Sequence, residues 1–135
     1  MPILIDGWNL IRDDESDMRD DETDSTECAR RLVVEMEQFR ASHSDPITLV
    51  FDSSSGYLDI KYDNHPGLSI VAARDADDYI KRFIDRVPER QRRNLRVVSS
   101  DSDVFYYAKS SYATPLLSSD FWGTIRKSRR NFPNT

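Results

Sequence analysis

Acidic residues gather at four separate places in this chain, each where a predicted strand ends or a predicted helix begins. The four places are Asp6, Asp52, Asp77 with Asp78, and Asp101 with Asp103. Apolar, β-branched runs precede three of them, and the other opens an amphipathic helix. Strands that alternate with helices predict βαβ units and a parallel sheet covered on both faces. The carboxylates are then expected at the carboxyl edge of this sheet, where ligands bind in open α/β folds.

The expected elements fit one α/β domain spanning residues 1–135. Strands are expected at Pro2 to Asp6, Ile47 to Phe51, Leu68 to Ala73 and Leu95 to Ser99, with Ala113 to Leu117 as a further candidate. Helices are expected from Asp24 to Ser42, from Asp75 or Asp77 to Pro88, from Val104 to Lys109, and after Ser118-Ser119-Asp120. Residues 57–63 are compatible with a hairpin arm or with an irregular loop. The predicted fold class is a three-layer α/β sandwich with a central, mainly parallel sheet of four to five strands.

Length and composition agree with a single domain. At 135 residues the chain can enclose one hydrophobic core and is small for a two-domain enzyme. The single Cys28 excludes a disulfide framework and a thiolate metal cage. No apolar run is long enough to span a bilayer, and the first residues lack the basic flank and apolar stretch of a signal peptide. We therefore expect a soluble, cytoplasmic protein with no membrane partner, as a monomer or weak homodimer.

The charges are unevenly distributed along the chain, whose net charge is -5. Residues 13–27 contain nine acidic residues and one basic residue, so an acidic loop is expected at 13–24. Basic residues gather before the fourth predicted strand and in a C-terminal tail predicted at 126–135: Lys81, Arg82, Arg86, Arg90, Arg92, Arg93, Arg96, Arg126, Lys127, Arg129 and Arg130. Two interpretations stay open. These patches bind a phosphate backbone, or they are solvated helix faces and a solvated tail.

Carboxylates gathered at one edge of a sheet indicate a metal site. They repel one another unless a hard cation such as Mg²⁺ or Mn²⁺ neutralises them. An oxygen-only site that keeps part of the ion's water shell is suited to the hydrolysis of phosphodiester bonds. After the first strand, Gly7 lets the chain turn sharply, and Asn9 can direct a neutral amide toward Asp6 to orient a water molecule or a phosphate oxygen. After the fourth strand, Asp101 and Asp103 can direct two carboxylates at one ion.

Each acidic motif also has a purely structural interpretation. Asp6 can close an Asx-type turn at the end of a strand. Asp77 and Asp78 are favoured at the start of a helix by its dipole, with or without an ion. Asp52 can cap the serine-rich turn that follows it. The prediction of a metal site therefore depends on the coincidence of all four places at one edge of a single sheet.

Four segments of the chain, taken in order, resemble a known family. They are ILIDGWNLI, LVFDSSSG, ARDADDYIKRFI and RVVSSDSDV. Over nearly its whole length the chain is similar to the NYN domains of the PIN-like nuclease superfamily, in particular to the YacP-like bacterial branch. The resemblance implies a compact α/β nuclease fold in which acidic residues bind Mg²⁺ or Mn²⁺ and RNA is cleaved internally. The residues it implies for the site are Asp6, Asn9, Asp77, Asp101 and Asp103, with Asp52 at the end of the second strand and Asp78 as the alternative to Asp77.

RNA is the expected partner, as mRNA, tRNA or rRNA, with the ribosome as a further candidate. Single-stranded RNA is expected across the carboxyl edge of the sheet, and Trp8 either stacks on a base or packs in the core. The residues expected to bind its phosphates are Arg74, Arg126, Lys127, Arg129 and Arg130. The alternative function is a catalytically silent RNA- or ribosome-binding module of the same fold. The full set of carboxylates favours the ribonuclease, because a silent descendant has no reason to retain residues that repel one another.

Overall fold

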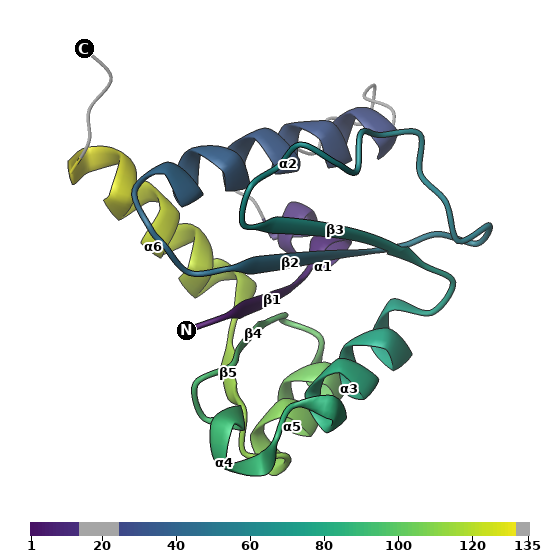
Figure 1. The fold of residues 1–135 in the computed structure, drawn as a ribbon, viewed down its shortest axis with the longest axis vertical. Coiled ribbons are helices and arrows are strands. Elements are labelled where there is room, and N and C mark those ends of the chain that lie inside the picture. Colours follow the sequence, from purple (N-terminus) through teal and green to yellow (C-terminus); the bar gives the residue numbers. More distant parts are fainter. Residues whose placement is uncertain (14–24, 132–135) are drawn as a thin grey trace.

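A parallel sheet forms the centre of the molecule, and helices cover both of its faces (Figure 1). This computed structural model describes residues 1–13 and 25–131. The strands are β1 (Ile3–Asp6), β2 (Ile47–Asp52), β3 (Leu68–Ala73), β4 (Arg96–Val98) and β5 (Thr114–Leu116). They lie in the order β3-β2-β1-β4-β5, and every neighbouring pair is parallel. The predicted α/β sandwich is confirmed, and the further candidate strand is part of the sheet.

The helices form two layers, one on each face of the sheet (Figure 1). The first layer contains α1 (Gly7–Arg12), α2 (Ser25–Ala41) and α6 (Ser118–Asn131). The second contains α3 (Ala76–Arg86) and α5 (Ser102–Ser110), with the short α4 (Glu89–Arg92) before β4. Successive side chains of a strand point to opposite faces. Ile3 and Ile5 of β1 therefore pack under the first layer, whereas Leu4 between them packs under the second.

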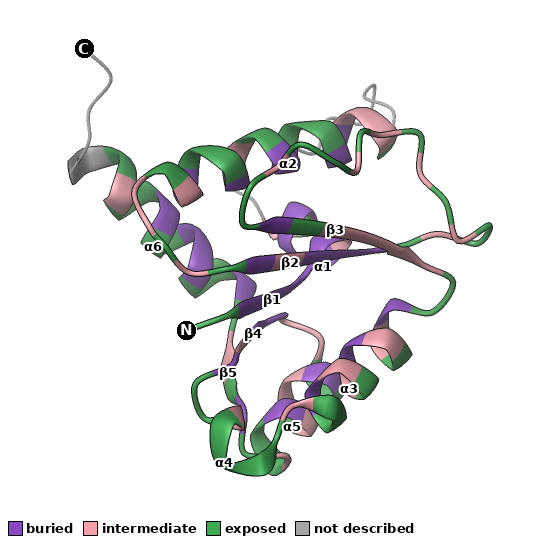
Figure 2. Ribbon diagram, in the orientation of Figure 1, coloured by how far each residue is buried: buried purple, intermediate pink, exposed green. Residues whose placement is uncertain are grey.

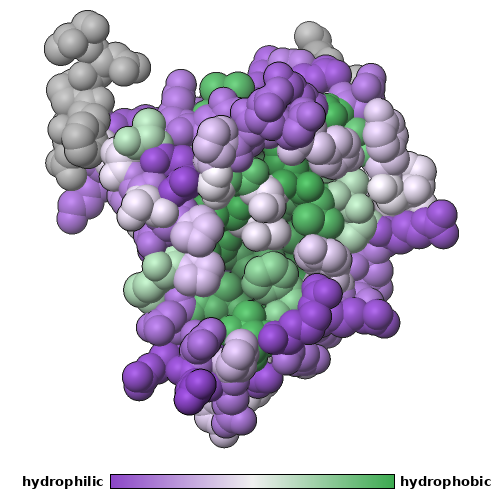
Figure 3. All heavy atoms as spheres, in the orientation of Figure 1, coloured by the Kyte–Doolittle hydropathy of each residue, from purple (hydrophilic) through white to green (hydrophobic). Residues whose placement is uncertain are grey.

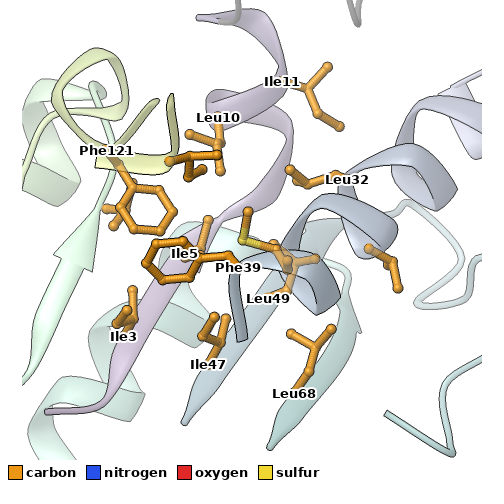
Figure 4. Packing of buried hydrophobic residues seen from close by; sticks show 14 of the residues in the cluster. Ile3, Ile5, Leu10, Ile11, Leu32, Phe39, Ile47, Leu49, Leu68 and Phe121 are labelled. Atoms are coloured by element: carbon orange, nitrogen blue, oxygen red, sulfur yellow. The ribbon is translucent and has the colours of Figure 1, made fainter. Parts of the chain in front are cut away.

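The larger of the two cores lies between the sheet and the first helical layer. Figure 4 shows Ile5 and Leu49 of the sheet facing Leu32 and Phe39 of α2 and Phe121 of α6. Figure 2 shows that the buried residues of these helices lie on the sides turned toward the sheet, whereas the outer sides are exposed. This pattern is typical of amphipathic helices that pack on a sheet. Burial of their apolar sides holds α1 and α6 against the sheet, near the strand ends that carry the acidic residues.

The order of the strands reverses beside β1. The chain adds β2 and β3 on one side of β1 and then returns to add β4 and β5 on the other. The register places Ile5 opposite Leu49 on β2 and opposite Val98 on β4. The segments that leave β1 and β4 therefore emerge side by side, at the kind of switch point where open α/β sheets bind ligands.

The connection between β2 and β3 is an irregular loop, so the alternative of a hairpin arm for residues 57–63 is wrong. Residues 53–67 form neither a helix nor a strand. The Tyr62 hydroxyl accepts a hydrogen bond from the Leu58 backbone N–H (2.8 Å) and donates one to the Leu58 carbonyl (2.9 Å). Arg30 of α2 donates to the Asp59 carbonyl at 2.7 Å. The loop is thus closed on itself and bound to the first helical layer.

Two sequence-based expectations need correction at the ends of the chain. Gly7 does not turn sharply, because α1 starts there directly. A Cβ atom at Gly7 would lie 2.6 Å from a ring carbon of Phe51, so this position requires glycine for close packing. Residues 126–131 continue α6 and are not part of a tail. The expected acidic loop lies outside the described residues, apart from Asp13.

The outer surfaces of the helices are mainly polar. In Figure 3 apolar atoms reach the surface in the middle of the view, on the side of the edge strand β3, between hydrophilic helix surfaces. In the described part of the chain, no helix combines the length and the apolar character needed to cross a lipid bilayer.

Candidate metal centre

Asp6 is the last residue of β1 and is buried at the switch point, with 7% of its surface exposed. Ser99, which follows β4, donates a hydrogen bond from Oγ to Asp6 Oδ2 at 3.2 Å. Burial, followed by the nearby Asp77 carboxylate, raises the pKa of Asp6 to about 6, against the opposing effects of Ser99 and Arg12. The charge of this carboxylate on the central strand is therefore only partly offset by Arg12.

Asp101 is the N-cap of α5, beside Asp6. Its Oδ1 accepts hydrogen bonds from the backbone N–H groups of Asp103 (2.9 Å) and Val104 (3.2 Å). Its own backbone N–H donates to Ser99 Oγ at 3.1 Å. The buried Ser99 hydroxyl thus links Asp101 to Asp6.

Asp77 approaches the same point from the first turn of α3. One carboxylate oxygen from each of Asp77, Asp101 and Asp103 lies within 4.8 Å of the others. The pKa of Asp77 is raised, first by partial burial and then by Asp101, Asp75 and Asp103. Three of the predicted site residues therefore converge from α3 and α5, and we call Asp77, Asp101 and Asp103 the acidic cluster.

The amide of Asn9 supports the backbone of this site. Its Oδ1 accepts hydrogen bonds from the Ser100 backbone N–H (2.6 Å) and from Ser118 Oγ (2.7 Å). Asn9 therefore joins α1 to the segment after β4 and to the start of α6. Both donors bind the amide oxygen, so the expected orientation of a water molecule or a phosphate oxygen would fall to the amide nitrogen.

Besides Asp6, which is buried beside it, two further predicted metal ligands lie outside the acidic cluster. Asp78, one position after Asp77, is turned to solvent and pairs with Arg82 at 2.9 Å. Asp52 is exposed at the end of β2, and its backbone carbonyl accepts the indole N–H of Trp8 at 2.6 Å. The half-buried Trp8 ring packs against Phe51, with ring centroids 4.9 Å apart. Trp8 therefore packs on the core, with only part of its ring open to a base.

Lys81 is a neighbour of the cluster that sequence analysis did not assign to the site. Its Nζ lies 2.6 Å from Asp103 Oδ2, and the proximity of this carboxylate raises the pKa of the lysine. Lys81 is four residues after Asp77, so both side chains lie on one side of α3. That spacing was the available signal, but it becomes informative only once α5 is known to lie beside α3.

The basic residues predicted to bind RNA occupy two separate places. Arg74 is exposed just after β3, at the same edge of the sheet as the acidic cluster. The helix α6, in contrast, starts beside Asn9 and runs toward the end of α2, where Ser128 Oγ lies 3.0 Å from Ser42 Oγ and Arg129 pairs with Glu35. At 1.5 Å per residue, Arg129 is about 16 Å along the axis from the start of α6. The group of Arg126, Lys127, Arg129 and Arg130 is thus displaced from the acidic cluster.

The acidic cluster fits a hard divalent cation. All of its donors are carboxylate oxygens, the ligands that Mg²⁺ and Mn²⁺ prefer. Two oxygens on one Mg²⁺ ion are at most about 4.2 Å apart, twice the usual distance of about 2.1 Å. The three carboxylates, now within 4.8 Å, need only a small closure to share an ion. After burial, repulsion from Asp101 and Asp103 contributes to the raised pKa of Asp77, and such an ion would relieve this repulsion.

Known structures share this architecture. A crystal structure of the W164L mutant of Rae1 (YacP) from Bacillus subtilis superimposes with a TM-score of 0.77 at 17% identity, over 97% of this chain and 79% of that one. Another crystal structure of Rae1 (YacP) from the same organism gives a TM-score of 0.69 at 16% identity, over 98% of this chain and 77% of that one. At these identities the likeness concerns the fold. No curated protein matched the sequence.

A family model adds evidence at the level of sequence. The model of the YacP-like NYN domain matches residues 3–135, which is nearly the whole chain. NYN domains generally comprise nucleases. Family model, shared fold and acidic cluster agree with one another, and the chain belongs to the YacP-like NYN domain family.

Proposed function

We propose that this protein is a metal-dependent endoribonuclease that hydrolyses phosphodiester bonds of single-stranded RNA in the cytoplasm. The observation that carries the proposal is the acidic cluster at the switch point of a YacP-like NYN domain, with the buried Asp6 beside it. A cluster of this kind disfavours the folded protein unless a ligand neutralises it. The presence of these carboxylates together at one place therefore supports a function that requires them.

The acidic cluster would hold Mg²⁺ or Mn²⁺ through Asp77, Asp101 and Asp103. Bound there, the cation would offset charge on the scissile phosphate and lower the pKa of an attacking water molecule. The protein contributes the positions of the ligands. Asp101 is fixed by the N-terminus of α5, and Ser99 connects it to Asp6.

Asp6 is suited to accept a proton from the attacking water. Its pKa of about 6 leaves it mainly ionised at pH 7 and more basic than an ordinary carboxylate. A general base with a pKa close to the working pH is the most effective one. Asn9 stabilises this arrangement because its amide holds the segment after β4 against α1.

Arg74 supplies a positive charge for the RNA backbone at the correct edge of the sheet. Its side chain is exposed, and within the described ranges no carboxylate pairs with it. A guanidinium can bind a phosphate in a bidentate manner. We therefore place the RNA near Arg74, with mRNA, tRNA or rRNA and the ribosome as the candidate sources of the strand.

The test compares two neighbouring carboxylates. Asp77→Asn removes a member of the acidic cluster, whereas Asp78→Asn removes a solvent-exposed neighbour that pairs with Arg82. With labelled single-stranded RNA and Mn²⁺ or Mg²⁺, we expect Asp77→Asn to lower the cleavage rate by about 100-fold or more, as loss of a key electrostatic group does. Asp78→Asn should cut at nearly the parent rate. Mn²⁺ should also raise the melting temperature of the parent and of Asp78→Asn, but not of Asp77→Asn.

Three results would contradict the proposal. The parent protein could bind RNA in EDTA and cut it with neither metal, which would identify a silent RNA-binding module. The parent could cut RNA equally well in EDTA, which would exclude a role for the cation. Asp77→Asn could cut as fast as the parent, which would show that the acidic cluster is not the catalytic site.

A further inference from the structure

An open hollow of about 620 Å³ lies on the surface of α5, next to the acidic cluster. Its lining residues are Asp103, Tyr106, Tyr107, Lys109 and Ser110. Asp103 is a member of the acidic cluster and also lines the hollow, so the two are adjacent. Anything seated in it would lie beside the candidate metal centre.

Tyr106 gives this hollow an aromatic surface. Its side chain is one of the most exposed large hydrophobic groups of the described chain, at 62%. Phe105 meets it at nearly a right angle, with ring centroids 5.4 Å apart and planes inclined by 80°, and so supports the ring from one side. Tyr106 lies three residues after Asp103, one turn along α5, so both side chains lie on the same helix face. An exposed, supported aromatic ring close to the acidic cluster is suited to stacking on a flat ligand.

Tyr107 forms a fixed wall of the hollow. Its hydroxyl donates to Asp85 at 2.7 Å, and Lys81 lies 5.4 Å from the centre of its ring. These contacts bind Tyr107 to α3 and already engage both its hydroxyl and its ring. Tyr106 is therefore the tyrosine that can take a ligand.

Lys109 adds a positive charge at the other end of the hollow. It is exposed, and in the part of the chain that the structure describes no carboxylate pairs with it. Lys81, by comparison, is paired with Asp103. Lys109 lies six residues after Asp103, about 9 Å along the axis of α5. At about 3.4 Å per stacked nucleotide, this distance corresponds to two or three nucleotides of one strand.

We propose that this hollow binds the nucleotides of single-stranded RNA next to the scissile phosphate, with one base stacked on Tyr106 and a nearby phosphate bound by Lys109. The proposal rests on the proposed nuclease function, which places a phosphate at the acidic cluster. The order of the groups along α5, first carboxylate, then aromatic ring, then ammonium, matches the order of phosphate, base and phosphate along a strand. Stacking on a side chain requires an unpaired base, so the surface selects single strands over duplexes.

The test measures affinity and catalysis separately in the full-length protein. A labelled, mixed-sequence RNA of about ten nucleotides is titrated in EDTA, and KM and kcat are measured with Mn²⁺. Loss of a stacking ring weakens binding of single-stranded nucleic acid by roughly fivefold or more. We expect Tyr106→Ala to raise Kd and KM by at least this factor while kcat stays within about twofold. Tyr106→Phe keeps the ring and should bind like the parent.

Lys109→Ala should weaken binding a few-fold and reduce the slope of log Kd against log salt by about 0.7, the value for one phosphate contact on a single strand. Two control variants remove matched groups elsewhere. Tyr112→Ala removes a tyrosine exposed to 65% that does not line the hollow, and Lys61→Ala removes an exposed lysine on the loop between β2 and β3. Neither should change the affinity. Thermal unfolding of each variant checks that the fold is intact.

An abasic oligonucleotide of equal length separates stacking from charge. It should bind the parent and Tyr106→Ala equally, because only the backbone is left to bind. If the parent cuts RNA but Tyr106→Ala shows an unchanged Kd and KM, the proposed subsite is wrong and the nuclease function stands. If Tyr106→Ala and Lys109→Ala weaken RNA binding but the parent cuts with neither metal, the binding surface stands and the nuclease function is wrong. Weaker binding by Tyr112→Ala to the same degree would also overturn the assignment.

Discussion

The two edges of the parallel sheet shift the pKa values of their aspartates in opposite directions. At the amino edge, Asp45 accepts contacts from the N-terminal ammonium (2.5 Å) and from Arg96 (2.9 Å), and these cations lower its pKa. At the carboxyl edge, burial and neighbouring carboxylates raise the pKa values of Asp6 and Asp77. At the amino edge, cations of the protein itself balance the charge of Asp45, and this pairing favours the folded state. The carboxyl edge has an excess of negative charge, which is what a site for an external cation requires.

The largest expected effect on stability concerns Asp6. Because its pKa is about 6 in the folded protein and 3.8 as a model value, the folded state binds this proton more tightly than the unfolded state. Asp6 therefore destabilises the protein as the pH rises from about 4 to about 6, by at most about 3 kcal/mol at 1.36 kcal/mol per pKa unit. Asp6→Asn should raise the free energy of unfolding at pH 7 by up to that amount in EDTA. It should also remove most metal-dependent cleavage.

Urea unfolding of the parent and of Asp6→Asn at pH 4 and pH 7 measures this effect. The gain in stability should be present at pH 7 and absent at pH 4, where the parent side chain is largely protonated. A variant that is equally stabilised at both pH values would show that relief of charge is not the cause. If Asp6→Asn were less stable than the parent at pH 7, Asp6 would stabilise the folded protein as Asp45 does, and the proposed contrast between the two edges would be wrong.

The next effect concerns Asp45 at the amino edge. Asp45→Asn keeps the size of the side chain but removes the charge that two cations contact, and should lower the free energy of unfolding at pH 7 by about 1 kcal/mol. The pKa of Asp45 is lowered in the folded state, so its stabilising effect is present above the unfolded value of 3.8 and is lost as the pH falls below it. The difference in stability between the parent and the variant should therefore shrink as the pH falls below 3.8. Addition of Mn²⁺ should leave their difference at pH 7 unchanged.

The smallest effect concerns Lys81, whose positive charge partly balances the carboxylates at the carboxyl edge of the sheet. Its ammonium contacts Asp103 and competes with an incoming cation for that carboxylate. Lys81→Met keeps the apolar length of the side chain, and should tighten Mn²⁺ binding by about twofold to fivefold, the range expected for an exposed ion pair. Isothermal titration measures the affinity, with Lys61→Met as the control for a general change in charge. Weaker Mn²⁺ binding in Lys81→Met would indicate that the lysine orders Asp103 for the cation.

Sequence reasoning succeeded where it depended on strands. The β-branched runs predicted β1 to β4 to within one residue at either end, and a parallel sheet brings their carboxyl ends to one edge. The meeting of Asp6 with Asp101 follows from these two facts. The helices α1 and α4 were missed, because six and four residues are too short to show a helical period.

The details of the site depend on contacts that no local pattern reveals. Successive helical positions differ by about 100°, which turns Asp77 inward and Asp78 toward Arg82, but the rotation of α3 is set by its packing. Asn9 finds its partners 91 and 109 residues later in the chain. The direction of α6 likewise places its basic residues away from the carboxyl edge of the sheet. The charge pattern of the sequence alone could not predict this direction.

The central position of β1 has a consequence for how the protein is made. β1 leaves the ribosome before the other strands of the described sheet, yet its partner β4 begins 90 residues after Asp6, at Arg96. At roughly 5–20 residues per second, β1 waits about 5 to 18 s with one side unpaired. Asn9 and Ser99 acquire their partners in the same late step. The candidate site can therefore be assembled only after the segment up to Ser118, which completes the contacts of Asn9, has been translated.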